Sequence, residues 1–220
     1  MTDVGLQHLR EMNRIRRLQI CECRFTDSAM KYSREMPALR MLNMQCITGF
    51  SDTALKSLAH LENLSIAGAS TEGSGMSHLK PLTRLHKFSL RSAKNDQVSD
   101  NALTELPAYP KLETLEFSWS AVSDRVVAEI PELPCLRPLD LSYTEVTYVA
   151  GAHLAQKCLV LEYVNWGGTR TTDQAIQHLL TLPMFERVRL NVTKVPENGV
   201  KELLAAKSQV WVTAKSDDLS

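Results

Sequence analysis

Apolar residues recur along the chain in one spacing: an aliphatic residue, two others, an aliphatic residue, one other, and a third aliphatic residue. Eight copies of this spacing begin at Ile15, Leu39, Leu61, Leu85, Leu112, Leu136, Leu161 and Phe185. The last two apolar positions flank a polar one, which predicts a short β-strand with one face inward. The segment Gln209–Val212 predicts a ninth, closing strand.

A second pattern, a hydroxyl residue followed by aspartate, lies between these predicted strands. It occurs at Thr2-Asp3, Thr26-Asp27, Ser51-Asp52, Ser99-Asp100, Ser123-Asp124 and Thr172-Asp173, with weaker copies at Glu72-Gly73, Thr147-Tyr148 and Pro196-Glu197. The steps between copies range from 21 to 27 residues. A period this regular predicts a solenoid of stacked units, because each unit is too small to bury its own apolar face.

Each hydroxyl-aspartate step is predicted to be the corner where a helix begins. Thr26 can accept a hydrogen bond from a free helical N–H group, and Asp27 lies where the helix dipole favours negative charge. Phe25 before them is predicted to enter the core, as are Val122, Val146 and Val195 in their own repeats. The repeated aspartate is therefore interpreted as structural, not catalytic.

These two patterns together resemble the leucine-rich repeat family, most closely its bacterial type with repeats of about 24 residues. The resemblance covers almost the whole chain and implies an α/β fold, a right-handed horseshoe solenoid with a parallel concave sheet and convex helices. We expect one domain over residues 1–213 and a disordered tail over 214–220.

Local departures from the repeat predict local irregularities. The third repeat is short by about three helical residues, and residues 92–97 insert a loop at the rim. Pro138 falls within a strand and predicts altered pairing there. No separate N-terminal cap is evident, so Leu6, Leu9 and Ile15 are expected to be exposed and to allow a homodimer through this end.

The composition points to a soluble chain with no general affinity for polyanions. Lys plus Arg and Asp plus Glu both number 25, so nucleic acid and membrane surfaces are not expected as partners. No apolar run is long enough to span a membrane. The five cysteines are scattered without a CxxC pair, which favours reduced thiols that pack as small hydrophobes. With no signal-peptide core at the N-terminus, a cytoplasmic location is favoured.

Catalytic and cofactor motifs are missing from the sequence. It contains no HExxH or GxSxG, and the glycine-rich stretch from Gly68 to Gly75 lacks the lysine of a phosphate loop. Glu129, His153 and His178 occupy one column of consecutive helices, but helix axes about 8–10 Å apart keep them from converging on one metal ion. We therefore expect no enzyme activity, cofactor or metal.

The polar side chains of the concave face are the candidate site, because they need not serve packing. Glu116 and Asp140 form an acidic spot, with basic residues on both sides and an aromatic pair, Trp119 and Tyr143, just beyond the strands. An acid/base pair in which the two carboxylates raise each other's pKa is the alternative interpretation of Glu116 and Asp140. The partner-binding residues predicted are Lys87, Arg91, Glu116, Trp119, Asp140, Tyr143, Tyr163, Asn165, Arg187 and Arg189.

The predicted function is a non-catalytic recognition module that binds a protein or peptide, or alternatively a glycan, on its concave face. A second hypothesis starts from the N-terminus, which begins inside a repeat and so suggests an excised fragment. On that hypothesis the chain is the substrate-recognition portion of a larger multidomain enzyme, such as a ubiquitin ligase or effector. A third hypothesis is that the chain is a purely structural spacer. It predicts that the concave residues can all be substituted at once with no loss of binding.

Overall fold

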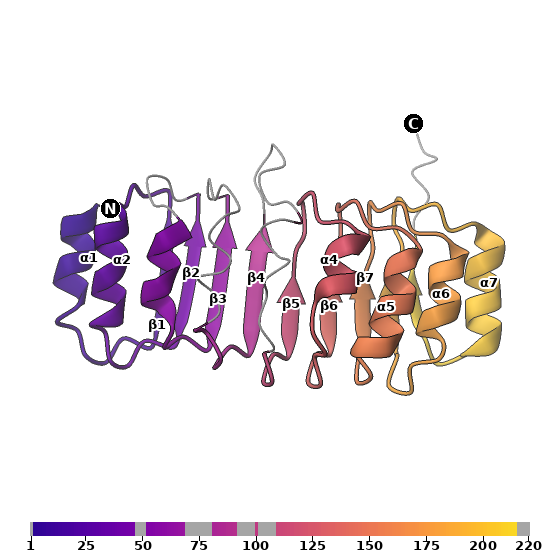
Figure 1. Cartoon of the computed structure of the whole chain (residues 1–220). Helices are drawn as coiled ribbons and strands as arrows, with labels where there is room; N and C mark the ends of the chain where they lie inside the picture. The colour runs from indigo at the N-terminus through magenta and orange to yellow at the C-terminus, as the bar shows by residue number, and fades with distance from the viewer. Residues whose placement is uncertain (1, 47–51, 69–80, 92–99, 101–108, 215–220) are drawn as a thin grey trace.

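Nine parallel strands form a single sheet in which each strand lies beside the next one in the chain. The computed structural model describes residues 2–46, 52–68, 81–91, 100 and 109–214. The strands are β1 (Arg17–Cys21), β2 (Met41–Gln45), β3 (Asn63–Ala67), β4 (Lys87–Arg91), β5 (Thr114–Glu116), β6 (Pro138–Asp140), β7 (Tyr163–Asn165), β8 (Arg187–Arg189) and β9 (Trp211–Thr213). Figure 1 shows them side by side in chain order, which confirms the predicted α/β solenoid.

The helices form a second layer against one face of this sheet (Figure 1). They are α1 (Asp3–Leu9), α2 (Asp27–Arg34), the 3₁₀ helix η1 (Asp52–Leu58), α4 (Asp124–Glu129), α5 (Val149–Lys157), α6 (Asp173–Leu179) and α7 (Glu197–Ala206). The tighter 3₁₀ form occurs in the short third repeat. The face of the sheet that points away from the helices, here called the open face, is the one predicted to be concave.

The core lies between sheet and helices and is built from equivalent positions of successive strands. Leu18, Leu42 and Leu64 are paired in register, and Phe88 and Leu115 continue the same row. All of these except the half-buried Leu18 of the first strand are fully buried. Each repeat thus covers the apolar face of its neighbour, as the predicted solenoid requires.

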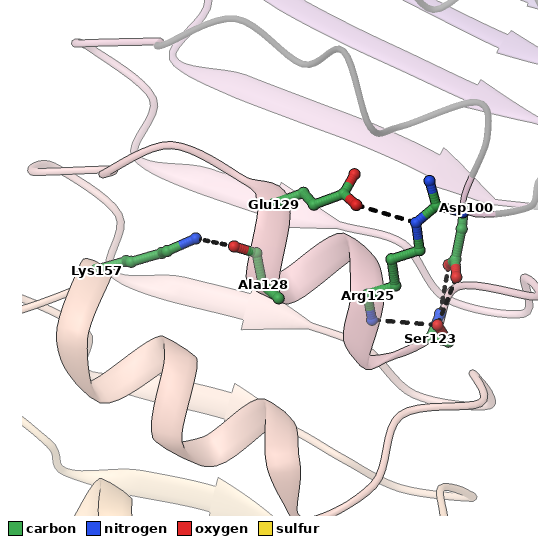
Figure 2. Close-up of polar contacts among 6 residues, drawn as sticks. All are labelled: Asp100, Ser123, Arg125, Ala128, Glu129 and Lys157. Atoms are coloured by element: carbon green, nitrogen blue, oxygen red, sulfur yellow. Dashed lines mark hydrogen bonds and ion pairs between the residues drawn. The ribbon is translucent and has the colours of Figure 1, made fainter.

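The repeated aspartates join one repeat to the next. The backbone N–H and hydroxyl of Thr26 donate to the Asp3 carboxylate over 3.0 and 2.6 Å. Asp100 receives the same pair of bonds from Ser123 (Figure 2). The predicted cap within a repeat is also present, since the Thr26 and Ser123 hydroxyls accept from the N–H groups of residues 28 and 125. The sequence did not reveal the bonds between repeats.

A lysine at the end of α5 forms a further link between repeats. The Lys157 ammonium group donates to the carbonyl oxygen of Ala128 (Figure 2). It also donates to the carbonyl oxygen of Ile130, and both acceptors lie at the end of the preceding helix α4. Lys207, two repeats later, also bonds back to the preceding repeat, donating over 2.6 Å to the Leu182 carbonyl just beyond the end of α6. A cation near a helix C-terminus satisfies carbonyl groups that have no helical partner and complements the helix dipole.

The chain leaves the strands through a left-handed residue at one repeated position. Gly68 and Gly168 have positive φ there, and so do five residues with side chains: Glu22, Cys46, Trp119, Tyr143 and Val192. Such a conformation favours glycine and costs other residues about 1–2 kcal/mol. The turn out of the strand therefore imposes this geometry whatever residue occupies the position.

Hydroxyl side chains close the same turn from the inside. The hydroxyls of Ser120, Thr144, Thr169 and Thr193 each donate to the backbone carbonyl three residues earlier, over 2.6–2.9 Å. The first three of these residues are buried. This repeated hydroxyl position is structural. It could be seen in the sequence as a Ser or Thr at the same place in four successive repeats.

Two further predicted irregularities fall on described residues and have different outcomes. Pairing between β5 and β6 covers only Leu115 with Leu139 and Glu116 with Asp140, so it begins after Pro138, which has no N–H to donate. At the N-terminus the expected exposure is wrong for Leu6, which is 0% exposed because α1 packs on α2. Leu9 and Ile15 are partly buried against the core, and the exposed apolar residues are Val4 and Met12.

Several predictions concern parts of the chain outside the described residues. These are the rim loop over 92–97, most of the glycine-rich stretch, the corners at Ser51, Glu72 and Ser99, and the tail beyond residue 214. The homodimer through the N-terminal end stays a prediction.

Candidate functional site

The open face carries the predicted site residues on five neighbouring strands. Lys87 and Arg91 belong to β4, Glu116 to β5, Asp140 to β6, Tyr163 and Asn165 to β7, and Arg187 and Arg189 to β8. Trp119 and Tyr143 follow β5 and β6 at the left-handed position. Seven of the ten line one groove of about 480 Å³: Arg91, Glu116, Trp119, Asp140, Tyr143, Asn165 and Arg189.

The two carboxylates of the predicted acidic spot are adjacent in register but face different partners. Glu116 forms an ion pair with Lys87, with 2.5 Å between its carboxylate oxygen and the lysine Nζ. Asp140 accepts from the backbone N–H and hydroxyl of Ser142 over 2.8 and 2.6 Å. The Asn165 amide donates to the other Asp140 oxygen over 2.9 Å. Both carboxylates are therefore already engaged by side chains or backbone groups of this chain.

The expectation that the polar side chains of this face need not serve packing is wrong at Asn165. Its exposed fraction is 6%, and its side chain bridges Asp140 and the backbone N–H of Gly167. Ser89, Ser118 and Ser142 of the same face are also buried. Asn165 therefore fixes the floor of the groove, and a partner could reach it only in part.

Trp119 and Tyr143 form a stacked pair at the edge of the groove. Their ring centroids are 3.9 Å apart and their planes differ by 14°. They remain 48% and 43% exposed, so the stack covers one face of each ring and leaves much of the pair open to solvent. Neither ring therefore enters the core between the sheet and the helices.

The Tyr143 ring is held from its other side by a glycine. A Cβ atom placed on Gly168 would lie 2.5 Å from Tyr143 Cδ1, so a residue with a side chain here would displace the ring. Gly168 also has φ of +72°, which favours glycine for a second reason. The tyrosine is therefore packed between Trp119 and the Gly168 backbone, in a fixed orientation beside the groove.

Of the three remaining predicted residues, Lys87 lines neither hollow, and Tyr163 and Arg187 lie around a second hollow of about 520 Å³ on the C-terminal strands. It is lined by Tyr163, Arg187, Arg189, Trp211 and Thr213. The Arg187 guanidinium carbon lies 5.9 Å from the centroid of the Tyr163 ring, within the range of a cation–π contact. Burial raises the pKa of Tyr163, as does the Asp140 carboxylate, while Arg189 and Arg187 oppose them.

Trp211 is the site residue that sequence reasoning missed. It is 70% exposed and pairs in register with Arg187, so it belongs to the open face. The sequence places it in the closing strand, where an apolar triplet favours a packing role for all three residues. The sequence did contain an indication, because Trp211 occupies the same position in its strand as Tyr163 and Arg187 occupy in theirs.

No metal centre is assembled within the described ranges of the chain. No group of three or more His, Cys, Asp or Glu side chains there is arranged to hold a metal ion, and Glu129, His153 and His178 lie on three separate helices.

The five cysteines are unpaired. Cys23 and Cys158 are buried as expected, and burial raises the pKa of the Cys158 thiol to about 12, but Cys21 and Cys46 are exposed. In the part of the chain that the structure describes, none of the helices has the length and hydrophobicity to cross a bilayer.

Comparison with solved structures identifies the fold. The chain resembles the internalin inlF from Listeria monocytogenes with a TM-score of 0.65 and 19% identity, over 99% of this chain and 70% of that one. It resembles internalin C2 from the same organism with a TM-score of 0.61 and 19% identity, over 86% and 76% of the two chains. A third similar structure comes from the yeast Rad7 and Elc1 complex, with a TM-score of 0.53 and 13% identity over 100% and 82%.

The sequence itself matches no protein-family profile and no curated protein. The structural likeness supports a leucine-rich-repeat fold for this chain, and at these identities it shows the fold alone.

Proposed function

We propose that this chain is a protein-recognition module that binds a peptide segment of its partner in the groove of the open face. The stacked pair of Trp119 and Tyr143 is the observation that carries this proposal. Two large aromatic side chains are exposed at left-handed positions where glycine is more stable, and the turn needs neither of them. Exposed, rigid aromatic residues next to charged groups are typical of interaction hot spots.

The surroundings of the pair fit this role. The groove is an open trough, and its polar floor is already hydrogen-bonded through Asp140, Ser142 and Asn165. A preformed surface of this kind pays little ordering cost when a partner binds. The carboxylates of Glu116 and Asp140 are occupied by internal partners, which argues against an acid/base reaction here.

The hypothesis that the chain is the substrate-recognition portion of a larger enzyme makes use of the same groove. Among the similar structures, one comes from a complex of two proteins, Rad7 and Elc1, which is consistent with a role in protein assembly. The hypotheses of a larger enzyme and of a glycan ligand stay predictions.

Peptide selection with matched variants tests the proposal. A displayed random-peptide library is selected on the wild-type protein, and the enriched peptides are measured by fluorescence anisotropy. The variant is Trp119→Gly with Tyr143→Gly, because glycine suits the left-handed backbone and the fold is retained. The control is Val192→Gly, an exposed residue at the same position of a later repeat, outside the groove.

We expect the double variant to bind the selected peptides at least about tenfold more weakly and the Val192 variant to bind them as the wild type does. Circular dichroism confirms that all three proteins are folded. Unchanged affinity in the double variant would show that the aromatic pair is not the recognition site.

A further inference from the structure

An aromatic–arginine–aromatic row crosses the last three strands of the open face. Tyr163 on β7, Arg187 on β8 and Trp211 on β9 are paired in register, so their side chains leave the same face side by side. Arg189 leaves this face two residues further along β8 and lines both the second hollow and the groove that holds the aromatic pair. The two hollows are therefore joined through Arg189.

Both arginines are charged, exposed and without an acidic partner among the described residues. The ion pairs found there use Arg10, Arg40, Lys87, Arg125, Arg137 and Lys201 as their cations. The nearest carboxylate in register with Arg189 is Asp140, two strands away, and Ser142 and Asn165 already occupy it. A partner with negative charge would thus find two free guanidinium groups.

We propose that Arg187 and Arg189 bind two carboxylates of an extended partner segment in which two acidic residues are separated by one residue. This inference rests on the proposed function and specifies the chemistry of the peptide. An apolar side chain of the same segment would cover the indole of Trp211, which is 70% exposed. Arginine is suited to this role because its planar guanidinium group binds a carboxylate through two parallel hydrogen bonds.

The spacing of the two arginines determines the spacing of the acidic residues. Alternate residues of a strand project from one face about 6.6 Å apart, and this holds both for β8 and for an extended peptide beside it. Acidic residues at positions i and i+2 can therefore each face one arginine. Adjacent acidic residues point to opposite sides of an extended segment, so only one of them can reach this surface.

The surface favours a peptide over a lone phosphate group. A single anion is held by donors that converge on it, whereas these guanidinium groups start from positions about 6.6 Å apart on an open strand. The rings of Tyr163 and Trp211 on both sides provide contact area for side chains. The 520 Å³ hollow is large enough for several side chains of an extended chain.

Three labelled synthetic decapeptides test the inference. Each has Gly-Ser flanks, and their cores are Glu-Leu-Glu-Leu, its isomer Glu-Glu-Leu-Leu, and the uncharged Gln-Leu-Gln-Leu. Binding is measured by fluorescence anisotropy on the wild type and on Arg187→Gln with Arg189→Gln. The control is Arg170→Gln with Lys194→Gln, which removes the same charge from exposed residues that follow β7 and β8, outside both hollows.

We expect the wild type to bind the alternating peptide at least about tenfold more tightly than its isomer. The Arg187 and Arg189 variant should lose this preference, while the Arg170 and Lys194 variant should keep it. Trp211→Ala should weaken binding of the alternating peptide. Higher salt should weaken that binding also, because the contact is between exposed charges.

Equal binding of the two isomers, or a preference that survives the loss of both arginines, would overturn the inference. So would displacement of the peptide by inorganic phosphate beyond the effect of sodium chloride at equal ionic strength, since that result indicates a phosphate site. If library-selected peptides lose affinity with Trp119→Gly and Tyr143→Gly but not with the arginine variant, the proposed function stands and only this inference fails.

Discussion

Replacing Asp124 with alanine should uncouple two neighbouring repeats. The Asp124 carboxylate accepts from the backbone N–H and hydroxyl of Thr147 over 2.8 and 2.5 Å, and from the Ala150 N–H over 3.2 Å. Hydrogen bonds to a charged group contribute about 1.5–3 kcal/mol each, but this site is partly exposed and water replaces some of what is lost. We expect the free energy of unfolding to fall by about 2–4 kcal/mol.

The chain contains its own control for this substitution. Asp173 occupies the same position one repeat before Pro196, which has no backbone N–H and no hydroxyl to donate. Asp173→Ala removes only the favourable charge in the first turn of α6, at a cost of about 0.3–1 kcal/mol. Asp124→Asn keeps one acceptor oxygen, so its loss in the free energy of unfolding should lie between those of the two alanine variants.

Urea unfolding followed by far-UV circular dichroism measures these differences by linear extrapolation. Amide hydrogen exchange adds a local measurement, because the N–H groups of Thr147 and Ala150 should exchange faster in Asp124→Ala. If Asp124→Ala and Asp173→Ala lower the free energy of unfolding equally, the hydrogen bonds between repeats do not stabilise the solenoid and the reasoning is wrong.

Three further predictions concern single residues. Gly168→Ala should lower the free energy of unfolding by about 1–3 kcal/mol and displace the Tyr143 ring, because φ is +72° and the new Cβ would lie 2.5 Å from Tyr143 Cδ1; an unchanged near-UV circular dichroism spectrum would contradict it. Val192→Gly should raise the free energy of unfolding by about 1 kcal/mol in urea, since a β-branched residue has φ of 58° there; a loss of stability would show that the valine side chain is needed. For His60, burial lowers the pKa below 6.5, and Arg40, Arg34 and Arg84 lower it further. The unfolded chain then binds the proton more readily, so stability present at neutral pH is lost as pH falls through 6.5 towards the lowered value. His60→Gln should lose less stability than the wild type between neutral pH and pH about 5 in urea titrations, with His8→Gln on α1 as the control; equal losses in His60→Gln and the wild type refute this.

The sequence predicted the parts of the fold that follow from periodic burial. The alternation around Leu42, Leu64 and Leu115 indicated both the strands and the face of each strand that enters the core, and their register confirms it. Neighbouring repeats of equal length bring equivalent positions together, so the lateral neighbours of Glu116, Asp140 and Arg189 were also predictable.

Side-chain partners within a column were not predictable, because several polar groups lie within reach of one another. Asp124 was read as a helix-dipole residue, yet its carboxylate bonds across the repeat boundary. Asn165 was placed on the surface, but it is buried because Asp140 and Gly167 both bind its amide. The left-handed position carries glycine in only two of its seven described copies, so its backbone geometry had no clear signature.

The chain ends were the least predictable regions, because a terminal repeat lacks a neighbour on one side. Leu6 was expected to be exposed, whereas α1 turns it against α2 and leaves Val4 and Met12 outside. At the other end Trp211 was grouped with its buried neighbour Val210, although the alternation of a strand places successive side chains on opposite faces.

Fluorine NMR of the protein labelled with 5-fluorotryptophan tests recognition on the open face most directly. The chain has three tryptophans, of which Trp119 and Trp211 are exposed on the two hollows and Trp166 is fully buried in the core. Titration with a peptide selected on the wild-type protein should shift the resonances of Trp119 and Trp211 and leave that of Trp166 in place. Saturating binding that moves neither Trp119 nor Trp211 would place the recognition site elsewhere on the molecule.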